Sequence, residues 1–265
     1  MKVCTVIVLF MWSLVAYSNE RQFTHTFHST ILEEARTVTV HLPDSYHDSD
    51  THYPTVYVLD GEADGELVAS TLRRMAVSEG AREQVVVTIH ATDRLRDYAP
   101  TINNDPRGPL GQGGGGDKFL DYMEKELVPF IGKHYRVNRE KTLSGHSVGG
   151  LLVMHSFHSR PHLFNAHLAF SPAVWWGEQE TLKATEEYVL SNKHIHTYLY
   201  MNIGAESGMM RRFYNALVRT ISRNRNVDLY FKSEEFDGEP HGLTFSAGLY
   251  SALRGLARYN NLTAQ

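Results

Sequence analysis

Residues 141–155 read KTLSGHSVGGLLVMH, an apolar run that ends in a glycine-rich corner and continues at once into a second apolar run. The corner, residues 145–149, matches the pattern G-x-S-x-G between a strand and a helix. Such a corner holds its serine in a strained backbone conformation, and the flanking glycines let strand and helix approach without a Cβ clash. An ordinary glycine-rich turn is the alternative, but this context favours Ser147 as a nucleophile.

On both sides of this corner, short β-branched runs alternate with amphipathic stretches. Strands are expected at residues 23–29, 36–42, 54–59, 84–89, 141–144, 166–170, 196–203 and 227–236. Helices are expected at residues 64–78, 117–135, 148–159, 178–191, 208–224 and 243–259. Asp117 is the expected N-cap of its helix, and Pro129 is expected to kink that helix or split off its last turn. An antiparallel start followed by β-α alternation predicts an α/β fold, with a mostly parallel sheet of about eight strands and helices on both faces.

The composition excludes several classes of protein. Hydrophobic residues make up 42% of the chain and charged residues 21%, which argues against disorder, collagen and coiled coil. The 26 Lys and Arg against 30 Asp and Glu give a net charge of −4. A nucleic-acid partner is therefore not expected, because such binders carry a basic excess. The single cysteine, Cys4, excludes an intramolecular disulfide.

The amino terminus has the pattern of a secretory signal. Lys2 precedes an apolar run from Val3 to Ala16, and small residues stand at the two positions that a signal peptidase reads, ahead of Asn19. We therefore expect residues 1–18 to be a signal peptide and residues 19–265 a single domain, periplasmic or secreted, with no stable membrane anchor after cleavage. A membrane anchor or a buried helix is the alternative, but the run is short for a membrane span.

A serine nucleophile needs a base within hydrogen-bond reach, and the base needs a carboxylate that orients it. Enzymes built on such a corner place Ser, Asp or Glu, and His in that order along the chain. His241 follows the last strand, and Glu206 follows the strand before it. We therefore expect Ser147, His241 and Glu206 to form a triad. Asp237 is the rival carboxylate, and a helix-start charge is the alternative role for Glu206.

Two backbone N–H groups should stabilise the oxyanion that forms during such a reaction. Val148, directly after the nucleophile, is expected to supply one of them. The loop after the third strand, residues 59–62 (LDGE), is expected to supply the other through Glu62. In this interpretation Gly61 permits the turn, and Asp60 is a structural hydrogen-bonding residue.

Four side chains are candidates for contacting a substrate: Arg94, Arg96, Trp175 and Trp176. The arginines follow a strand on the nucleophile's edge of the sheet, where a guanidinium can bind an acidic group. The alternative is an ion pair with Asp93 or Asp97 that fixes the loop. The tryptophans follow another strand and are suited to walling an acyl or aryl pocket, with burial in the core as the competing interpretation.

Residues 108–116 (GPLGQGGGG) form a low-complexity stretch without the sequence context of a phosphate loop. A flexible surface loop, either without a role or acting as a lid, is expected there. His155, His158, His162, His194 and His196 are interpreted as solvent-facing or packing residues, with a metal site as the weaker alternative. Because no H-E-x-x-H pattern or second cluster supports zinc, neither a metal nor another cofactor is expected.

Several motifs together resemble the putative esterase family of α/β-hydrolases, in particular its periplasmic siderophore esterase-like branch beside the esterase D-like enzymes. The motifs are VYVLDGE (56–62), TDRLRDYAPT (92–101), GGGGDKFLDYMEKELVPFI (113–131) and LSGHSVGGLL (143–152). The resemblance implies the α/β-hydrolase fold and ester or thioester hydrolysis without a metal. It supports Ser147, His241 and the LDG loop. It leaves the acid open, because members of the family differ there and some use a Ser–His pair.

The sequence therefore predicts a secreted or periplasmic serine hydrolase that cleaves carboxylic esters through an acyl-enzyme. Its expected partner is a small-molecule ester, and siderophore lactones are the favoured substrate class. An acyltransferase or thioesterase on the same scaffold is one alternative. A relative that kept the fold and binds a ligand without turnover is another.

Overall fold

The structure is a computed structural model, and it describes residues 21–106, 108–224 and 226–263. Eight strands form one sheet: β1 (Gln22–Ser29), β2 (Glu34–His41), β3 (Tyr53–Val58), β4 (Val85–Ile89), β5 (Val137–His146), β6 (Ala166–Phe170), β7 (His194–Ile203) and β8 (Val227–Glu235). Their order across the sheet is β1-β2-β4-β3-β5-β6-β7-β8. β2 runs antiparallel to both β1 and β4, and all other neighbours are parallel. The predicted α/β fold class is confirmed, with a mostly parallel sheet.

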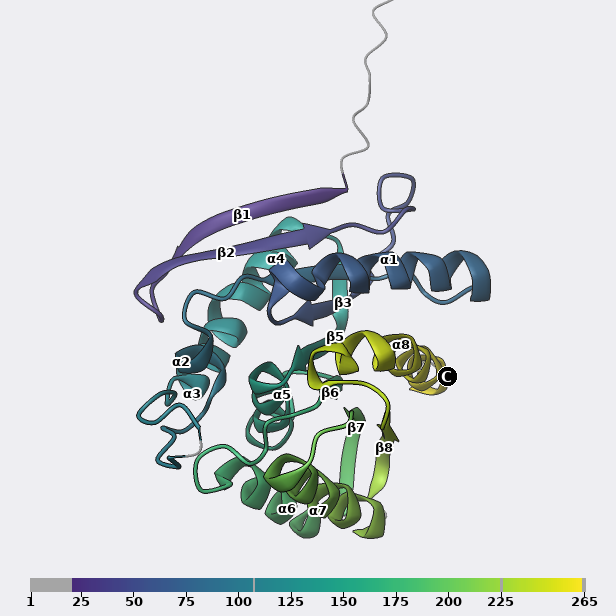
Figure 1. The fold of residues 1–265 in the computed structure, drawn as a ribbon. Helices are drawn as coiled ribbons and strands as arrows, with labels where there is room; N and C mark the ends of the chain where they lie inside the picture. Colours follow the sequence, from purple (N-terminus) through teal and green to yellow (C-terminus); the bar gives the residue numbers. More distant parts are fainter. Residues whose placement is uncertain (1–20, 107, 225, 264–265) are drawn as a thin grey trace, which may run out of the picture.

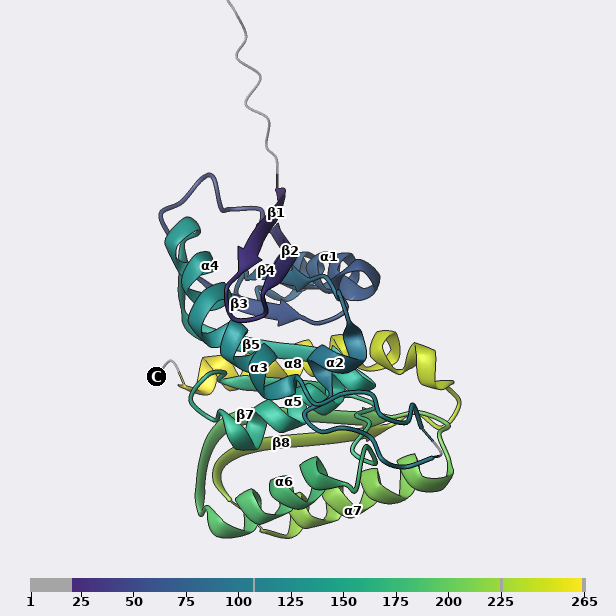
Figure 2. The same ribbon diagram turned by 90° about the vertical axis from the view of Figure 1, so that its left-hand side faces the viewer.

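Helices cover both faces of this sheet. They are α1 (Gly61–Glu79), α2 (Arg94–Tyr98), α3 (Gly116–Tyr122), α4 (Val128–His134), α5 (Val148–Ser159), α6 (Glu180–Ser191), α7 (Gly208–Asn224) and α8 (Thr244–Thr263). In Figure 1, α1 and α8 lie to the right of the central strands, whereas α2, α3 and α5 lie to the left. Figure 2, drawn from that left side, shows α3 and α5 in front of the sheet.

β3, β4 and β6 are buried along their whole length, and most of their residues are apolar because both of their faces are covered. In β3, Val56 and Val58 pack with residues of α1 and α8, whereas Tyr57, together with Leu59 just after the strand, packs with residues of α5. Two buried hydrophobic clusters result, one on each face of the sheet. The edge strand β1 alternates instead between exposed and half-buried residues, as expected for one face in solvent.

The predicted helix over residues 117–135 is divided into three parts. α3 is followed by a π-helical turn (Met123–Leu127) and then by α4, in which Pro129 is the second residue. Proline is tolerated there because its missing N–H falls in the first turn. Asp117 is not the N-cap: the helix begins at Gly116, and the Asp117 carboxylate pairs with His155 in α5. Tertiary pairing thus displaces the expected cap.

The glycine-rich segment, residues 108–116, lies mostly at the surface, as its composition predicts, and backbone hydrogen bonds join it to the preceding segment. The N–H of Gly114 donates to the carbonyl of Ala99, and the N–H of Gly115 donates to the carbonyl of Arg96, both at 2.9 Å. A Cβ at position 115 would lie 2.6 Å from that Arg96 oxygen. At this position, glycine serves the close packing of two backbone segments.

The parallel strands bring several loops to one edge of the sheet. Because carboxyl ends of parallel strands meet at the same edge, the residues that follow β3, β5, β6, β7 and β8 gather there. They include Asp60, Ser147, Ser171, Glu206 and His241. Within the described ranges, none of the helices combines the length and apolar character needed to cross a bilayer. The expected signal peptide, residues 1–18, lies outside the described residues.

Candidate active site

Ser147 lies on a sharp corner between β5 and α5. Its backbone has φ 59° and ψ −114°, a strained conformation for a residue with a side chain. The surrounding structure fixes this conformation: the Ser147 N–H donates to the carbonyl of Phe170 at 2.9 Å. A Cβ at Gly145 would approach the backbone of Gly149 to 2.7 Å. Glycine at position 145 is therefore required by contact, and the corner lifts the Ser147 hydroxyl above the sheet edge.

His241 reaches this hydroxyl from a short 3₁₀ turn after β8 (His241–Leu243). Its Nε2 lies 3.0 Å from Ser147 Oγ, and its Nδ1 lies 2.7 Å from Glu206 Oε1. With the proton on Nδ1 donated to the carboxylate, Nε2 is free to accept the serine proton. The His241 side chain is 38% exposed, so a substrate can approach from solvent.

Glu206 is the carboxylate that contacts His241, and it lies on the loop after β7. Its side chain is 8% exposed. Oε1 also accepts from the Ser171 hydroxyl at 2.6 Å, and Oε2 accepts from the N–H of Gly204 at 2.6 Å. Burial raises the pKa of Glu206, but the hydrogen bonds from Ser171, His241 and Gly204 outweigh it, so this pKa lies below its ordinary value. The geometry therefore holds Glu206 as a carboxylate.

The rival carboxylate, Asp237, lies elsewhere. Its side chain is 78% exposed and pairs with Arg211 at 2.9 Å. Arg211 also pairs with Glu235, so Asp237 belongs to a surface ion-pair group at the start of α7. The carboxylate that contacts His241 is thus Glu206.

His146, the variable residue of G-x-S-x-G, contacts the loop that carries the base. Its Nε2–H donates to the carbonyl of His241 at 2.9 Å, and the two rings lie 4.6 Å apart between centroids. Burial, together with the neighbouring His241, lowers the pKa of His146 to about 4. It is a neutral ring that holds the base loop against the corner. Sequence reasoning missed it, because the pattern leaves that position free.

The two expected N–H donors occupy the first turns of two helices. Val148 is the first residue of α5 and Glu62 the second of α1, so neither N–H has a partner within its own helix. The turn before α1 is made by Asp60, whose backbone is left-handed at φ 55°. Gly61 serves another purpose than expected: a Cβ there would lie 2.5 Å from Thr88 Cβ in β4.

Arg94 joins these two loops. Its guanidinium forms two hydrogen bonds with the Asp60 carboxylate, at 2.8 and 3.0 Å, and donates to the carbonyl of His146 at 2.9 Å. The partner is therefore neither of the predicted aspartates. Burial raises the pKa of Asp60, whereas the bonds from Arg94 oppose that shift. Arg94 thus fixes the LDG loop relative to the nucleophile corner.

Arg96 is also held by protein carboxylates. It pairs with Asp97, as the structural alternative predicted, and with Glu34 in β2. The unpredicted helix α2 carries both arginines, and the side chain of Asp93 caps it by accepting from the Arg96 N–H at 3.1 Å. Both guanidinium groups therefore have protein partners.

The tryptophans divide between the two interpretations. Trp176 is buried in the core, and its indole N–H donates to the carbonyl of Thr101 at 2.8 Å. Trp175 is only partly buried and lies against Gly108, where a Cβ would come within 3.0 Å of the indole. The residue two positions earlier, Ala173, donates its N–H to the carbonyl of Ser147. Of these two tryptophans, Trp175 is thus the one whose side chain remains partly exposed, on the loop that Ala173 joins to the corner.

Comparison with known proteins identifies the class. Residues 29–254 match the family model described as Putative esterase. The chain is 27% identical over 214 residues to the ferri-bacillibactin esterase BesA of Bacillus subtilis, covering 71% of this chain and 73% of that protein. It is 31% identical over 156 residues to the siderophore triacetylfusarinine C esterase of Aspergillus fumigatus, covering 54% of this chain and 52% of that protein.

The solved structure of an IroE-like serine hydrolase from Shewanella oneidensis superimposes with a TM-score of 0.85 at 30% identity. The match covers 89% of this chain and 80% of that one. Fold and relatives together define an ester-hydrolysing enzyme with the α/β-hydrolase fold. The chain belongs to the putative esterase family, and its similarity to proteins named as siderophore esterases confirms the predicted branch.

Proposed function

We propose that this enzyme is a serine esterase in which Ser147 attacks the ester carbonyl to form an acyl-enzyme. His241 Nε2 accepts the serine proton as the Oγ–carbon bond forms, and it then donates that proton to the leaving alcohol. Glu206 holds the ring in the required tautomer and stabilises its charged form. His241 then accepts a proton from a water molecule as the water oxygen attacks the acyl-enzyme. It donates that proton to Ser147 Oγ as the bond to the acyl carbon breaks and the acid is released.

The negative oxygen of each tetrahedral intermediate would be held by the N–H groups of Val148 and Glu62. Both belong to helix starts, where the helix dipole also favours negative charge. In this proposal Arg94 acts indirectly. Because Asp60 occupies its guanidinium, it positions the loop that carries Glu62 instead of clamping an acidic substrate.

The observation that carries the proposal is the continuous chain of contacts from Ser147 through His241 to Glu206, at 3.0 and 2.7 Å. The test is labelling by a fluorophosphonate probe together with turnover of an activated short-chain ester. Ser147→Ala should abolish labelling and lower kcat by about 10⁴-fold or more. Ser159→Ala is the matched control and should keep both properties, because Ser159 is the last residue of the helix that follows Ser147 and its hydroxyl donates to the His155 carbonyl. Full turnover by the Ser147 variant would refute the scheme.

We further propose that the substrate is a siderophore ester or lactone and that the enzyme acts in the periplasm or after secretion. Support comes from the names of the relatives, from the TDRLRDYAPT motif and from the signal-like residues 1–18. The Ser147–His241 pair is open to solvent, which suits a bulky substrate.

A substrate panel tests this assignment. It compares a cyclic catecholate trilactone, a feruloyl ester and an acyl thioester, with the products identified by mass. The trilactone should give the highest kcat/KM, and its products should contain one added water per bond cleaved. Preference for the thioester, or transfer of the acyl group to an added alcohol, would assign the scaffold to thioesterase or acyltransferase chemistry instead.

A further inference from the structure

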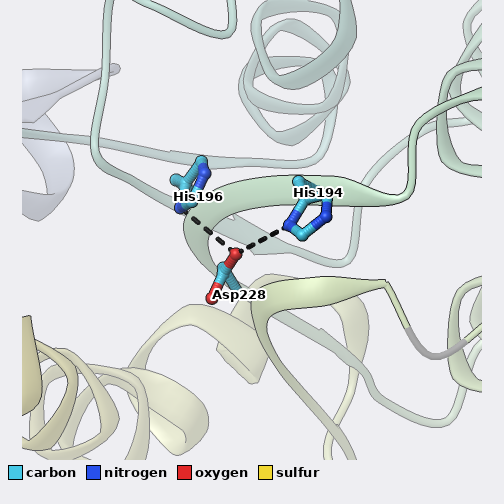
Figure 3. A group of neighbouring side chains, drawn as sticks. All are labelled: His194, His196 and Asp228. Carbon is cyan, nitrogen blue, oxygen red and sulfur yellow. Dashed lines mark hydrogen bonds and ion pairs between the residues drawn. The ribbon is translucent and has the colours of Figure 1, made fainter.

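Two histidines and an aspartate converge at the end of the sheet opposite Ser147. His194 is the first residue of β7, His196 lies two residues further on, and Asp228 is the second residue of the neighbouring strand β8. Figure 3 shows both imidazole rings turned toward the Asp228 carboxylate from the adjacent strand. All three side chains are exposed. One ligand atom of each side chain lies within 4.8 Å of the other two, which is close enough to bind a single metal ion.

The two distances from the aspartate oxygen fit the separation of ligands around one metal ion, and the three ligand atoms all lie within 4.8 Å of one another. Asp228 Oδ2 lies 3.2 Å from His194 Nδ1 and 3.4 Å from His196 Nδ1. A tetrahedral ion with bonds of about 2.0–2.1 Å to nitrogen and oxygen separates its ligands by about 3.3–3.4 Å. An ordinary ion pair requires only one such contact. Here Asp228 Oδ2 lies close to the Nδ1 atoms of both His194 and His196, at distances near the separation of two ligands on one ion.

The pocket beside this group is rich in imidazole. It has a volume of about 250 Å³, and its lining includes His162, His167, His194 and His196. His167 is fully buried, and its Nε2 has no hydrogen-bond partner within the described protein. Leaving a buried polar atom unpaired is costly, and the imidazoles of His194 and His196 therefore adjoin a polar pocket large enough to hold water.

We propose that His194, His196 and Asp228 bind one borderline divalent transition-metal ion, such as Zn²⁺, with water completing its coordination. Two imidazoles and one carboxylate suit such ions better than Mg²⁺ or Ca²⁺, which prefer oxygen ligands. This differs from the sequence-based expectation of no metal, because the third ligand comes from another strand. β7 is ten residues long, which places the group about 30 Å from the catalytic edge. The ion would therefore join the starts of β7 and β8 and take no part in ester cleavage.

Metal titration of the untagged full-length chain tests this proposal. Zn²⁺ should bind with one strong site by calorimetry, and Co²⁺ should give visible absorption bands of a nitrogen- and oxygen-ligated ion. Loss of an outer-shell partner alone costs about 10–100-fold in metal affinity, so His196→Gln and Asp228→Asn should each weaken binding by about 100-fold or more. His28→Gln, an exposed histidine of β1, is the matched control and should bind as the wild type does.

Two further measurements separate this site from the active site and from misfolding. Saturating Zn²⁺ should raise the melting temperature of the wild type and of His28→Gln but not that of His196→Gln. Ester turnover by His196→Gln should equal that of the wild type, which shows that the variant is folded. Equal Zn²⁺ affinity in the wild type and His196→Gln, or the lack of a saturable site, would overturn the proposal.

Discussion

Replacing Glu206 by glutamine should lower kcat strongly while leaving the protein folded. The Glu206 carboxylate accepts three hydrogen bonds, at 2.7 Å from His241 Nδ1, 2.6 Å from the Ser171 hydroxyl and 2.6 Å from the Gly204 N–H. In this arrangement every neighbour is a donor. A glutamine amide must therefore turn its NH₂ group toward at least one donor, whichever way it is placed.

The size of the effect follows from this conflict. When the NH₂ faces His241, the ring must carry its proton on Nε2, where it cannot accept from Ser147. Wrong-tautomer variants of serine hydrolases lose about 10⁴-fold in kcat. At about 1.36 kcal/mol per factor of ten, a loss of 10³–10⁴-fold corresponds to about 4–5 kcal/mol of activation free energy. Water can compensate little, because the Glu206 side chain is only 8% exposed.

Steady-state hydrolysis of a chromogenic short ester measures the loss, and urea unfolding checks that the variant is folded. Asp237→Asn is the matched control, since that carboxylate pairs with Arg211, and its kcat should stay within about twofold of the wild type. A Glu206→Gln enzyme within tenfold of the wild type would refute the triad and favour a Ser–His pair. A large loss in Asp237→Asn alone would assign the acid to Asp237.

Three other substitutions test the roles of Arg94, Gly145 and His158. Arg94→Lys keeps the positive charge but loses the three hydrogen bonds of the guanidinium. We therefore expect kcat to fall by about 10–100-fold with little change in KM. A rise in KM alone would instead indicate that Arg94 binds the substrate. Gly145→Ala places a Cβ 2.7 Å from the backbone of α5 and should destabilise the fold by about 1–3 kcal/mol in urea, whereas Gly132→Ala, with nothing within 4 Å, should not. Burial, with a smaller contribution from neighbouring His155, lowers the pKa of His158 from its ordinary value of 6.5 to about 4. The unfolded chain therefore takes up a proton as the pH falls from 6.5 to 4, and stability is lost over that window. His158→Asn should reduce this slope by about 1.4 kcal/mol per pH unit, and an unchanged slope in pH-dependent unfolding would contradict the assignment.

The nucleophile corner was predictable because its information is local. Ser147 stands between a strand and a helix that the sequence marks clearly, and glycines stand where a Cβ would clash. Glu206 and His241 were predictable by a longer inference, from the order of strands and the rule that parallel strands end at one edge. That rule brings the loops together without knowledge of any side-chain contact.

The hydrogen-bond and ion-pair partners that position these residues and their neighbouring loops were not predictable in the same way. Arg94 pairs with Asp60 and not with the aspartates next to it in sequence, and Asp117 pairs with a histidine of α5 instead of capping its own helix. Ser171 and His146 bond Glu206 and the His241 loop, respectively, across distances of 35 and 95 residues in the chain. In each case the partner is a residue that the fold brings close, and the local sequence does not indicate which residue that is.

The sequence by itself determined the alternation of elements, the strained serine corner and the order of Ser147, Glu206 and His241 after successive strands, because periodicity and glycine placement act over a few residues. Only the tertiary structure decided which carboxylate faces His241, which partner each arginine takes, and that His194 and His196 share Asp228. Hydrogen bonds and ion pairs depend on distances of about 3 Å. Such distances between residues far apart in the chain are set by how strands and helices pack.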